Sequence, residues 1–219
     1  MNIAPHIVID GITGCGKDTQ ISLLLGRALR EGRQLMSGPA LGGTVVGNEM
    51  RRVFLDPDLG MKAAPKTQCF MNMTSWIEQL KTVVWPYLDQ AIPFVWNRGD
   101  SSLLAYQIYG LEAPELEKEF WSMMRPLVFG ERTPSLYIFL EVLPVVAHER
   151  VLERKRGGGP GASIIFDAKT VEFYKRLHDG FQVFSQHPDV RAVKVDGNRS
   201  REEIHEDIYR IVSKECGWK

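Results

Sequence analysis

Residues 7–20 read IVIDGITGCGKDTQ, and this stretch decides the fold. An apolar strand runs into a glycine-rich turn that carries one lysine, and a helix-forming sequence follows. The spacing from Gly11 to Gly16 and Lys17 is that of a P-loop, in which backbone N–H groups surround nucleotide phosphates and the lysine supplies a positive charge. A chance glycine turn is the alternative, but strand, loop and helix signals agree here. We therefore predict a phosphate site at the start of a helix over residues 17–31.

Asp18 departs from the P-loop pattern, which has a serine or threonine after the lysine as a ligand for Mg²⁺. The hydroxyl moves to the next position, Thr19. Because a carboxylate also binds a hard cation, directly or through water, we predict that Asp18 is the metal ligand. The residues predicted to hold the donor nucleotide in this loop are Gly11, Thr13, Gly14, Cys15, Gly16, Lys17, Asp18 and Thr19.

The composition favours one globular domain over residues 1–219, since 219 residues with 44% hydrophobic content can bury one substantial core. Lys and Arg total 27, and Asp and Glu also total 27, so no basic field indicates nucleic acid or membrane as a partner. Three scattered cysteines indicate reduced thiols and a cytoplasmic protein. We find no export signal and no apolar run of membrane-spanning length.

Apolar strands alternate with amphipathic helices along the chain. The predicted strands cover residues 6–10, 92–97, 135–142 and 190–195, with a weaker strand near 34–37. The predicted helices cover residues 17–31, 44–55, 66–90, 101–109, 144–156, 167–186 and 200–214. This order predicts an α/β fold with a parallel sheet covered on both faces, whose ligands bind after residues 10, 97 and 142.

The 66–90 helix carries an apolar stripe of Met73, Trp76, Ile77, Leu80, Val83, Val84 and Tyr87. We expect this stripe to be buried, and we expect Pro86 to bend or end the helix. Ser200 and Glu203 predict a capping box at the start of the last helix.

Two further basic positions are candidate anion sites. Arg98 follows the strand 92–97, where it could hold a second phosphate or simply pair with Asp100 on the surface. Arg150, Arg154 and Arg156 precede a glycine run at 157–161, which is typical of a hinged lid that closes over a transferring phosphoryl group. A helix C-terminus that favours cations and ends at glycine is the alternative.

Taken together, these motifs resemble the thymidylate kinase family of nucleoside monophosphate kinases over nearly the whole chain. The resemblance is carried by residues 7–11 and 16–20, by the GGT segment at 42–44 with Gly47 and Arg51, by Arg98 with Ser102 and the AYQ of 105–107, and by residues 137–156. It implies a three-layer P-loop kinase fold with a five-stranded parallel sheet, a short flexible lid at about 150–166, and a homodimer.

The implied activity is transfer of the γ-phosphoryl group of ATP, with Mg²⁺, to a (deoxy)nucleoside 5′-monophosphate, most simply dTMP or a related or modified pyrimidine deoxynucleotide. Lys17, Arg98, Arg154 and Arg156 are the implied catalytic residues, and Arg150 the lid contact to ATP. Because Gly14 stands where one branch of the family has an arginine, the lid is expected to supply the catalytic one, Arg154 or Arg156. The implied acceptor-binding residues are Asp10, Arg51, Phe70, Trp76, Arg98, Ser102, Tyr106 and Gln107.

Several departures from the family pattern lie where the acceptor is recognised. Asn97 replaces the aspartate of the Asp-Arg pair, a loss that Asp10 and Asp18 could offset, and Thr13 replaces an acidic residue near the acceptor sugar. The base-binding arginine falls at Trp76 and the stacking phenylalanine at Asn72, unless a register shift brings in Phe70. Trp76 is either a core residue or a stacking partner of the base. We interpret these changes as a pocket altered for a different or modified pyrimidine.

Three other functions compete with this interpretation. Asn97 and Asp18 favour a catalytically inactive nucleotide-binding protein on the same fold, whereas the retained Lys17, Arg98 and lid arginines oppose it. A switch GTPase needs an Asn-Lys-x-Asp motif, and a motor ATPase needs a strand that ends in Asp-Glu. Neither occurs in this sequence.

Overall fold

The computed structural model describes residues 3–157 and 170–218. Its centre is a five-stranded sheet in which all strands are parallel and the order is β2-β3-β1-β4-β5. The strands are β1 (His6–Asp10), β2 (Met36–Pro39), β3 (Phe94–Asn97), β4 (Leu136–Glu141) and β5 (Ala192–Asp196). The predicted α/β class and parallel sheet are therefore confirmed, including the weak second strand, which lies two residues later than expected.

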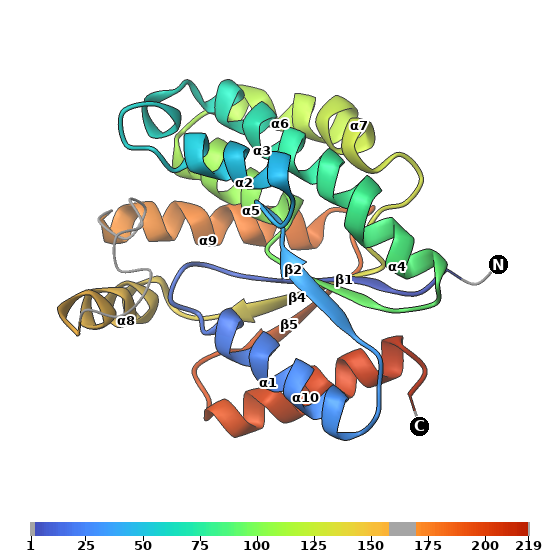
Figure 1. Cartoon of the computed structure of the whole chain (residues 1–219). Coiled ribbons are helices and arrows are strands. Elements are labelled where there is room, and N and C mark those ends of the chain that lie inside the picture. Colours follow the sequence, from blue (N-terminus) through green and yellow to red (C-terminus); the bar gives the residue numbers. More distant parts are fainter. Residues whose placement is uncertain (1–2, 158–169, 219) are drawn as a thin grey trace.

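Helices cover both faces of the sheet (Figure 1). One face carries α1 (Lys17–Arg30) and α10 (Arg201–Glu215), which pack on each other. The other carries α9 (Val171–Gln186) and the helices that follow β2 and β3. α8 (Pro144–Arg156) follows β4 at the carboxyl end of the sheet (Figure 1). The capping box of α10 is present, with Ser200 and Glu203 bonded reciprocally.

The three central strands, β1, β3 and β4, are largely apolar and buried, as expected for strands that are covered on both faces. Every residue of β1 is buried, and Ile7, Val8 and Ile9 have no exposed surface. The register pairs Ile9 with Asn97 on one side and Asp10 with Phe139 on the other, so the ends of β1, β3 and β4 lie next to each other. The chain that leaves these three strands builds the site.

Two helices follow β2. α2 (Val45–Phe54) begins at Thr44, whose hydroxyl accepts the Gly47 N–H, and a 3₁₀ turn (Gly60–Lys62) leads to α3 (Pro65–Gln79). α3 continues through a π-helical segment (Leu80–Val84) into α4 (Trp85–Asp89). Pro86 therefore does not end the helix. Proline has no backbone N–H to donate, and the wider π turn just before it means that no donor is required at this position. The predicted stripe is buried at Met73, Trp76, Leu80 and Val84 and half-buried at Ile77, Val83 and Tyr87.

The region after β3 differs most from expectation. α5 (Asp100–Leu103) continues into a π-helical segment (Leu104–Gly110), close to the predicted 101–109. The chain is then helical from 114 to 129, which the sequence pattern did not predict. That region comprises a 3₁₀ turn (Pro114–Leu116), α6 (Glu117–Glu119), a π-helical segment (Phe120–Met124) and α7 (Arg125–Phe129). Prolines and a π turn break the 3.6-residue periodicity by which helices are recognised.

Most of the proposed lid, residues 158–166, lies outside the described residues, as do residues 167–169 of the predicted 167–186 helix. The described part of the lid is the end of α8, where the Gly157 N–H donates to the Glu153 carbonyl. Within the described part of the chain, no helix is both long and apolar enough to cross a membrane.

Candidate active site

The loop between β1 and α1 has the conformation that a phosphate cradle needs. Gly11, Gly14 and Gly16 all have positive φ angles, of 148°, 91° and 95°. Gly16 is the N-cap of α1 and, having no side chain, cannot cap the first turn. The N–H groups of that turn are thus left for an anion, which the helix dipole also favours. Lys17, the first residue of α1, is 5% exposed.

Gly14 brings the loop against α8. A Cβ atom at this position would lie 2.4 Å from the carbonyl oxygen of Ala147. No larger residue fits without moving one of the two backbones, so the loop cannot carry an arginine here. This contact gives a physical reason for the expectation that a catalytic arginine comes from the lid.

Asp10 organises the ends of β1 and β3 from a fully buried position. Its Oδ1 accepts from the Gly11 N–H and the Ser102 hydroxyl, at 2.8 and 2.9 Å. Its Oδ2 accepts from the Ser101 hydroxyl and the Gly99 N–H, at 2.6 and 3.2 Å. The carboxylate thus fixes the loop that carries Arg98, and Asp10 is not among the residues that line the cavity described below.

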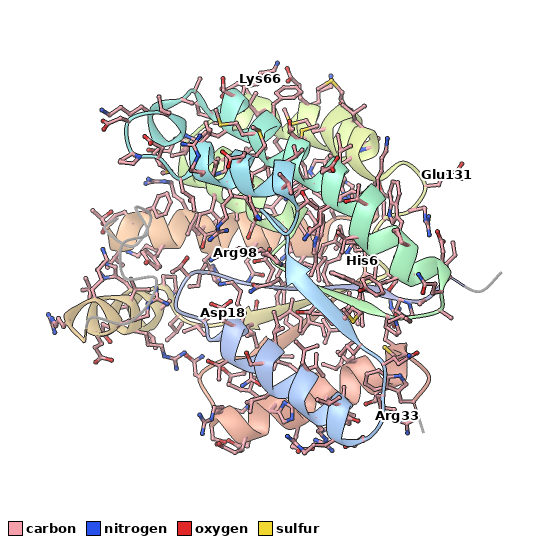
Figure 2. The ribbon with its side chains drawn as sticks, viewed as in Figure 1. His6, Asp18, Arg33, Lys66, Arg98 and Glu131 are labelled. Carbon is pink, nitrogen blue, oxygen red and sulfur yellow. The ribbon has the colours of Figure 1, made fainter. Side chains whose placement is uncertain are left out.

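Arg98 lies beyond the end of β3 (Figure 2), in the left-handed region with a φ of 70°. Its Nη1 donates to the Ser102 hydroxyl at 3.3 Å, and its Nη2 donates to the Thr13 hydroxyl at 3.1 Å. The Asp10 carboxylate is farther away, with its Oδ1 4.0 Å from Arg98 Nη1. Although burial lowers the pKa of Arg98, Tyr106 and Asp10 raise it overall, so the guanidinium remains charged.

The alternative pairing of Arg98 with Asp100 is wrong. Asp100 is fully buried and forms an ion pair with Arg125, with Nε and Oδ2 2.8 Å apart. The Tyr137 hydroxyl donates to the other carboxylate oxygen at 2.8 Å. This network anchors the first turn of α5 to α7 and β4. Arg98 does not take part in it and lines the cavity instead.

A cavity of about 480 Å³ opens beside Arg98, between the P-loop, α2, α3 and the helix after β3. Arg51 of α2 also lines it, and its Nη1 donates to the Leu41 carbonyl at 3.2 Å. Burial and the charge of Arg98 together lower the pKa of Arg51. Both guanidinium groups line the cavity, and a doubly charged anion bound there would relieve their mutual repulsion.

The hydroxyl of Tyr106 closes one wall of the cavity against the P-loop. It accepts from the Thr13 N–H at 3.0 Å and lies 2.8 Å from the Thr13 hydroxyl. Gln107 lines the cavity and donates to the Gln68 side chain at 3.5 Å. The structure therefore brings together four of the predicted acceptor residues, Arg98, Ser102, Tyr106 and Gln107, and it adds Thr13, which was predicted to hold the donor.

Asp18 lies at the start of α1 (Figure 2), where its Oδ1 accepts a 2.7 Å hydrogen bond from Asn97 Nδ2. Partial burial raises the pKa of Asp18, but the charge of Lys17 and the bond from Asn97 lower it overall, with smaller contributions from Arg98 and Arg154. A carboxylate is thus present at the end of β3 although residue 97 itself is neutral. Asn97 Oδ1 is buried and has no hydrogen-bond partner within the described structure.

The three lid arginines differ in what they contact. Arg150 Nη1 donates to the Gly197 carbonyl, beyond β5, at 3.3 Å. Arg154 is half-buried, and its charge reaches Asp18. Arg156 is exposed at the end of α8. Arg154, one of the two arginines favoured from the sequence, therefore contributes to the electrostatic environment of the P-loop carboxylate.

Residues on α3 fall into two groups. Trp76 and Asn72, 3% and 8% exposed, both line the cavity. Phe70 is 40% exposed and is not among the lining residues, so the alternative in which a register shift brings Phe70 to the base is not supported. The indole of Trp76 packs against Trp96 with ring centroids 6.0 Å apart, which makes it a core residue with one edge at the cavity.

The sequence did not single out some residues that line the cavity, including Asn48, Phe54 and Leu103. Asn48 lies one turn before Arg51 on α2, so helical spacing could have found it. No local sequence pattern marked Phe54 and Leu103 as cavity residues. An apolar residue on a helix is interpreted as a core residue whether or not it also lines a cavity.

A P-loop with a buried lysine, next to a cavity lined by two arginines, is typical of a P-loop kinase. The sequence model of one such family, thymidylate kinase, matches residues 9–208. The chain belongs to the thymidylate kinase family, whose phosphoryl donor is ATP, and is a nucleoside monophosphate kinase of the dTMP kinase-like type.

The chain is 31% identical over 207 residues to "Thymidylate kinase" of Halothermothrix orenii, an alignment that covers 94% of this chain and 95% of that protein. It is 27% identical over 203 residues to "Thymidylate kinase" of an Exiguobacterium species, with 92% and 91% covered. The enzyme of the same name from Trichormus variabilis is 28% identical over 207 residues, with 94% of each chain covered. These relatives give no support to the inactive alternative.

Proposed function

We propose that this protein transfers the γ-phosphoryl group of ATP to the 5′-phosphate of a pyrimidine deoxynucleotide, either dTMP or a related or modified one. The observation that carries the proposal is the pair of guanidinium groups, Arg51 and Arg98, which line one cavity beside the P-loop. The phosphate of a nucleoside monophosphate carries the negative charge that two guanidinium groups would bind.

Each charged group then has one task. The loop amides and Lys17 hold the donor phosphates, and Arg98 and Arg51 hold the acceptor phosphate. Arg154, at the end of α8, adds positive charge where negative charge spreads over the transferring oxygens. Little covalent chemistry is required of the protein, because positioning and charge neutralisation supply most of the rate in phosphoryl transfer.

A magnesium ion fits the residues at the end of β3. Asp18 offers a carboxylate with a lowered pKa, and Asn97 offers a buried amide oxygen without a partner in the described structure. Mg²⁺ is usually held by one or two carboxylates together with substrate phosphates, so these groups suffice. We propose Asp18 as its principal protein ligand. When bound, Mg²⁺ would neutralise the phosphates beside Lys17.

The acceptor base would lie against α3, where Asn72 and Trp76 line the cavity in place of the usual phenylalanine and arginine. We propose that these substitutions alter which pyrimidine is accepted and that the accepted base is that of dTMP or a related or modified one. Arg51 and Arg98 engage only the phosphate, so they are indifferent to this choice.

A coupled phosphorylation assay tests the proposal. ATP would be combined with dTMP, dUMP, dCMP, dAMP and dGMP, and with 5-substituted dUMP derivatives. The expected result is turnover with pyrimidine deoxynucleotides, and a loss of at least about 10-fold in kcat/KM for Arg98→Ala, because a charge-assisted bond to phosphate is lost. Arg132→Ala is the control, since Arg132 pairs with Asp89 away from the cavity. Failure to form any nucleoside diphosphate across this panel would refute the proposal.

We further propose that the protein works as a homodimer in the cytoplasm. Exposed apolar side chains on α2 and α3, namely Val45, Val46 and Phe70, support a second copy packing on these helices. The apolar stripe of the 66–90 region does not support this dimer, because its residues are buried or half-buried in the core of the same chain. Three cysteines without disulfides support a reducing compartment. Sedimentation equilibrium would measure the mass, and a monomer at micromolar concentration would refute the dimer.

A further inference from the structure

Two polar side chains of α3 are buried although neither lines the cavity beside Arg98. Ser75 has no exposed surface, and Gln79, one helical turn later, is 1% exposed. Burying a polar group costs free energy unless it is hydrogen-bonded, so such residues need a partner. Their partners all lie in the backbone and side chains that lead to the cavity.

Gln79 uses both ends of its amide to join the carboxyl ends of β2 and β3. Its Nε2 donates to the Pro39 carbonyl at 2.7 Å, and its Oε1 accepts from Trp96 Nε1 at 2.5 Å. Pro39 is the last residue of β2, and Trp96 immediately precedes the last residue of β3. Gly43 lies close to the same amide, since a Cβ atom there would be 2.4 Å from Gln79 Nε2. α3 thus holds the two strands at the point where the chain leaves them.

Ser75 holds the loop that follows β2, residues 40–43. Its hydroxyl accepts from the Gly42 N–H at 3.0 Å. The other end of the loop is tied to β3, because the Ala40 N–H donates to the Asn97 carbonyl at 3.0 Å. The loop is therefore fixed both to α3 and to the strand that leads to Arg98.

This loop in turn contacts the second arginine of the cavity. The Leu41 carbonyl accepts from Arg51 Nη1 at 3.2 Å. Ala40 and Leu41 line the cavity together with Arg51 and Arg98. The position of the loop therefore affects where the Arg51 guanidinium stands relative to that of Arg98.

We propose that Ser75 and Gln79 are positioning residues for the acceptor phosphate. By fixing residues 39–43, they hold the Leu41 carbonyl where it directs the Arg51 guanidinium to the cavity that Arg98 also lines. This inference rests on the proposed function, in which both arginines bind that phosphate. A guanidinium that is already in place binds an anion more tightly, because less conformational freedom is lost on binding.

The first test measures dTMP binding by titration calorimetry without ATP. Ser75→Ala removes the acceptor of the Gly42 N–H and should weaken dTMP binding about 5- to 10-fold. Binding of a non-hydrolysable ATP analogue should change by less than about 2-fold, because the P-loop is not altered. In an Arg51→Ala background, Ser75→Ala should change dTMP binding by less than about 2-fold, because its effect acts through Arg51. A loss of equal size in both backgrounds would show a merely structural role and overturn the inference.

Gln79 is tested in the same way. Gln79→Met keeps the length of the side chain but removes its donor and its acceptor, so it should also weaken dTMP binding only where Arg51 is present. Gln79→Glu is the conservative variant, since a protonated carboxyl group both donates to Pro39 and accepts from Trp96, and it should restore most of the affinity. Ser75→Ala removes a single hydroxyl and keeps the test decisive if Gln79→Met fails to fold in a thermal unfolding experiment.

Ser135→Ala is the matched control. The Ser135 hydroxyl also bonds a backbone group, the His6 carbonyl at 3.2 Å, but Ser135 does not line the cavity or contact the loop 40–43. This variant should bind dTMP as the unmodified protein does. An equal loss in Ser135→Ala and Ser75→Ala would contradict the inference.

The second test uses no ligand and so does not depend on the proposed function. The Arg51 Nε–H signal in a heteronuclear NMR spectrum, assigned by its loss in Arg51→Lys, reports how ordered this side chain is. Its heteronuclear NOE should fall in Ser75→Ala and stay the same in Ser135→Ala. An unchanged NOE in Ser75→Ala would overturn the inference. If the unmodified protein neither bound nor phosphorylated any nucleotide, the proposed function would be refuted, and the NOE would still decide whether Ser75 orders Arg51.

Discussion

His6 makes the stability of this protein depend on pH in a way that can be worked out from its surroundings. The side chain is 3% exposed at the start of β1, with the edge of Trp96 5.1 Å away between ring centroids. Neither ring nitrogen has a hydrogen-bond partner in the described part of the chain. Burial without a partner penalises the charged form and lowers the pKa of His6 from 6.5 to about 3.

The sign of the effect follows from this lowered pKa. As pH falls below 6.5, the unfolded chain takes up a proton at His6 that the folded chain refuses until pH 3. The free energy of unfolding is therefore highest above pH 6.5 and falls by about 1.4 kcal/mol per pH unit between 6.5 and 3. The loss amounts to about 2 kcal/mol at pH 5 and about 5 kcal/mol at pH 3, against a total of about 5–15 kcal/mol for a typical domain.

Urea unfolding at pH 7, 6 and 5 would measure this loss. Carboxylates elsewhere also titrate on acidification, so the informative quantity is the difference between the unmodified protein and His6→Phe, which keeps a planar ring beside Trp96 but cannot titrate. The advantage of the unmodified protein over the variant should shrink by about 2 kcal/mol from pH 7 to pH 5. His6→Leu repeats the comparison with a different shape. Parallel curves for all three proteins would refute the reasoning.

Three further changes test other parts of the structure. Asp18→Ala should lower Mg²⁺-dependent kcat at least about 10-fold. The free energy of unfolding should change by less than about 0.5 kcal/mol. Intact turnover at saturating Mg²⁺ would contradict the metal role. Gly14→Ala should destabilise the fold by about 1–3 kcal/mol, because a Cβ would lie 2.4 Å from the Ala147 carbonyl at a φ of 91°; an unchanged melting temperature would show that the loop can move. Arg125→Met should cost about 3–5 kcal/mol by leaving Asp100 buried without its cation, and Asp100→Asn in the same chain should recover part of it in urea unfolding.

The sequence by itself determined the parts of this protein that depend on local patterns. The strand, glycine turn and lysine of residues 7–20 specify a phosphate cradle, because the required backbone angles and helix start are set by neighbours in the chain. Arg98 could be placed for the same reason, since a residue directly after a parallel strand must lie at the carboxyl edge of the sheet. The helix from 114 to 129 could not, because prolines and a π turn removed the periodicity that reveals a helix.

Only the tertiary structure decided which side chains meet. Asn97 and Asp18 are 79 positions apart, yet they share a hydrogen bond because β3 ends beside the start of α1. Asp10 looked like a residue that binds substrate or metal, but four donors from the P-loop, the residue before α5 and the first turn of α5 occupy its oxygens. Trp76 is both core and cavity wall, a distinction that periodicity cannot make. Such outcomes depend on strand register and helix packing, which bring distant residues within hydrogen-bonding distance and leave no trace in local sequence.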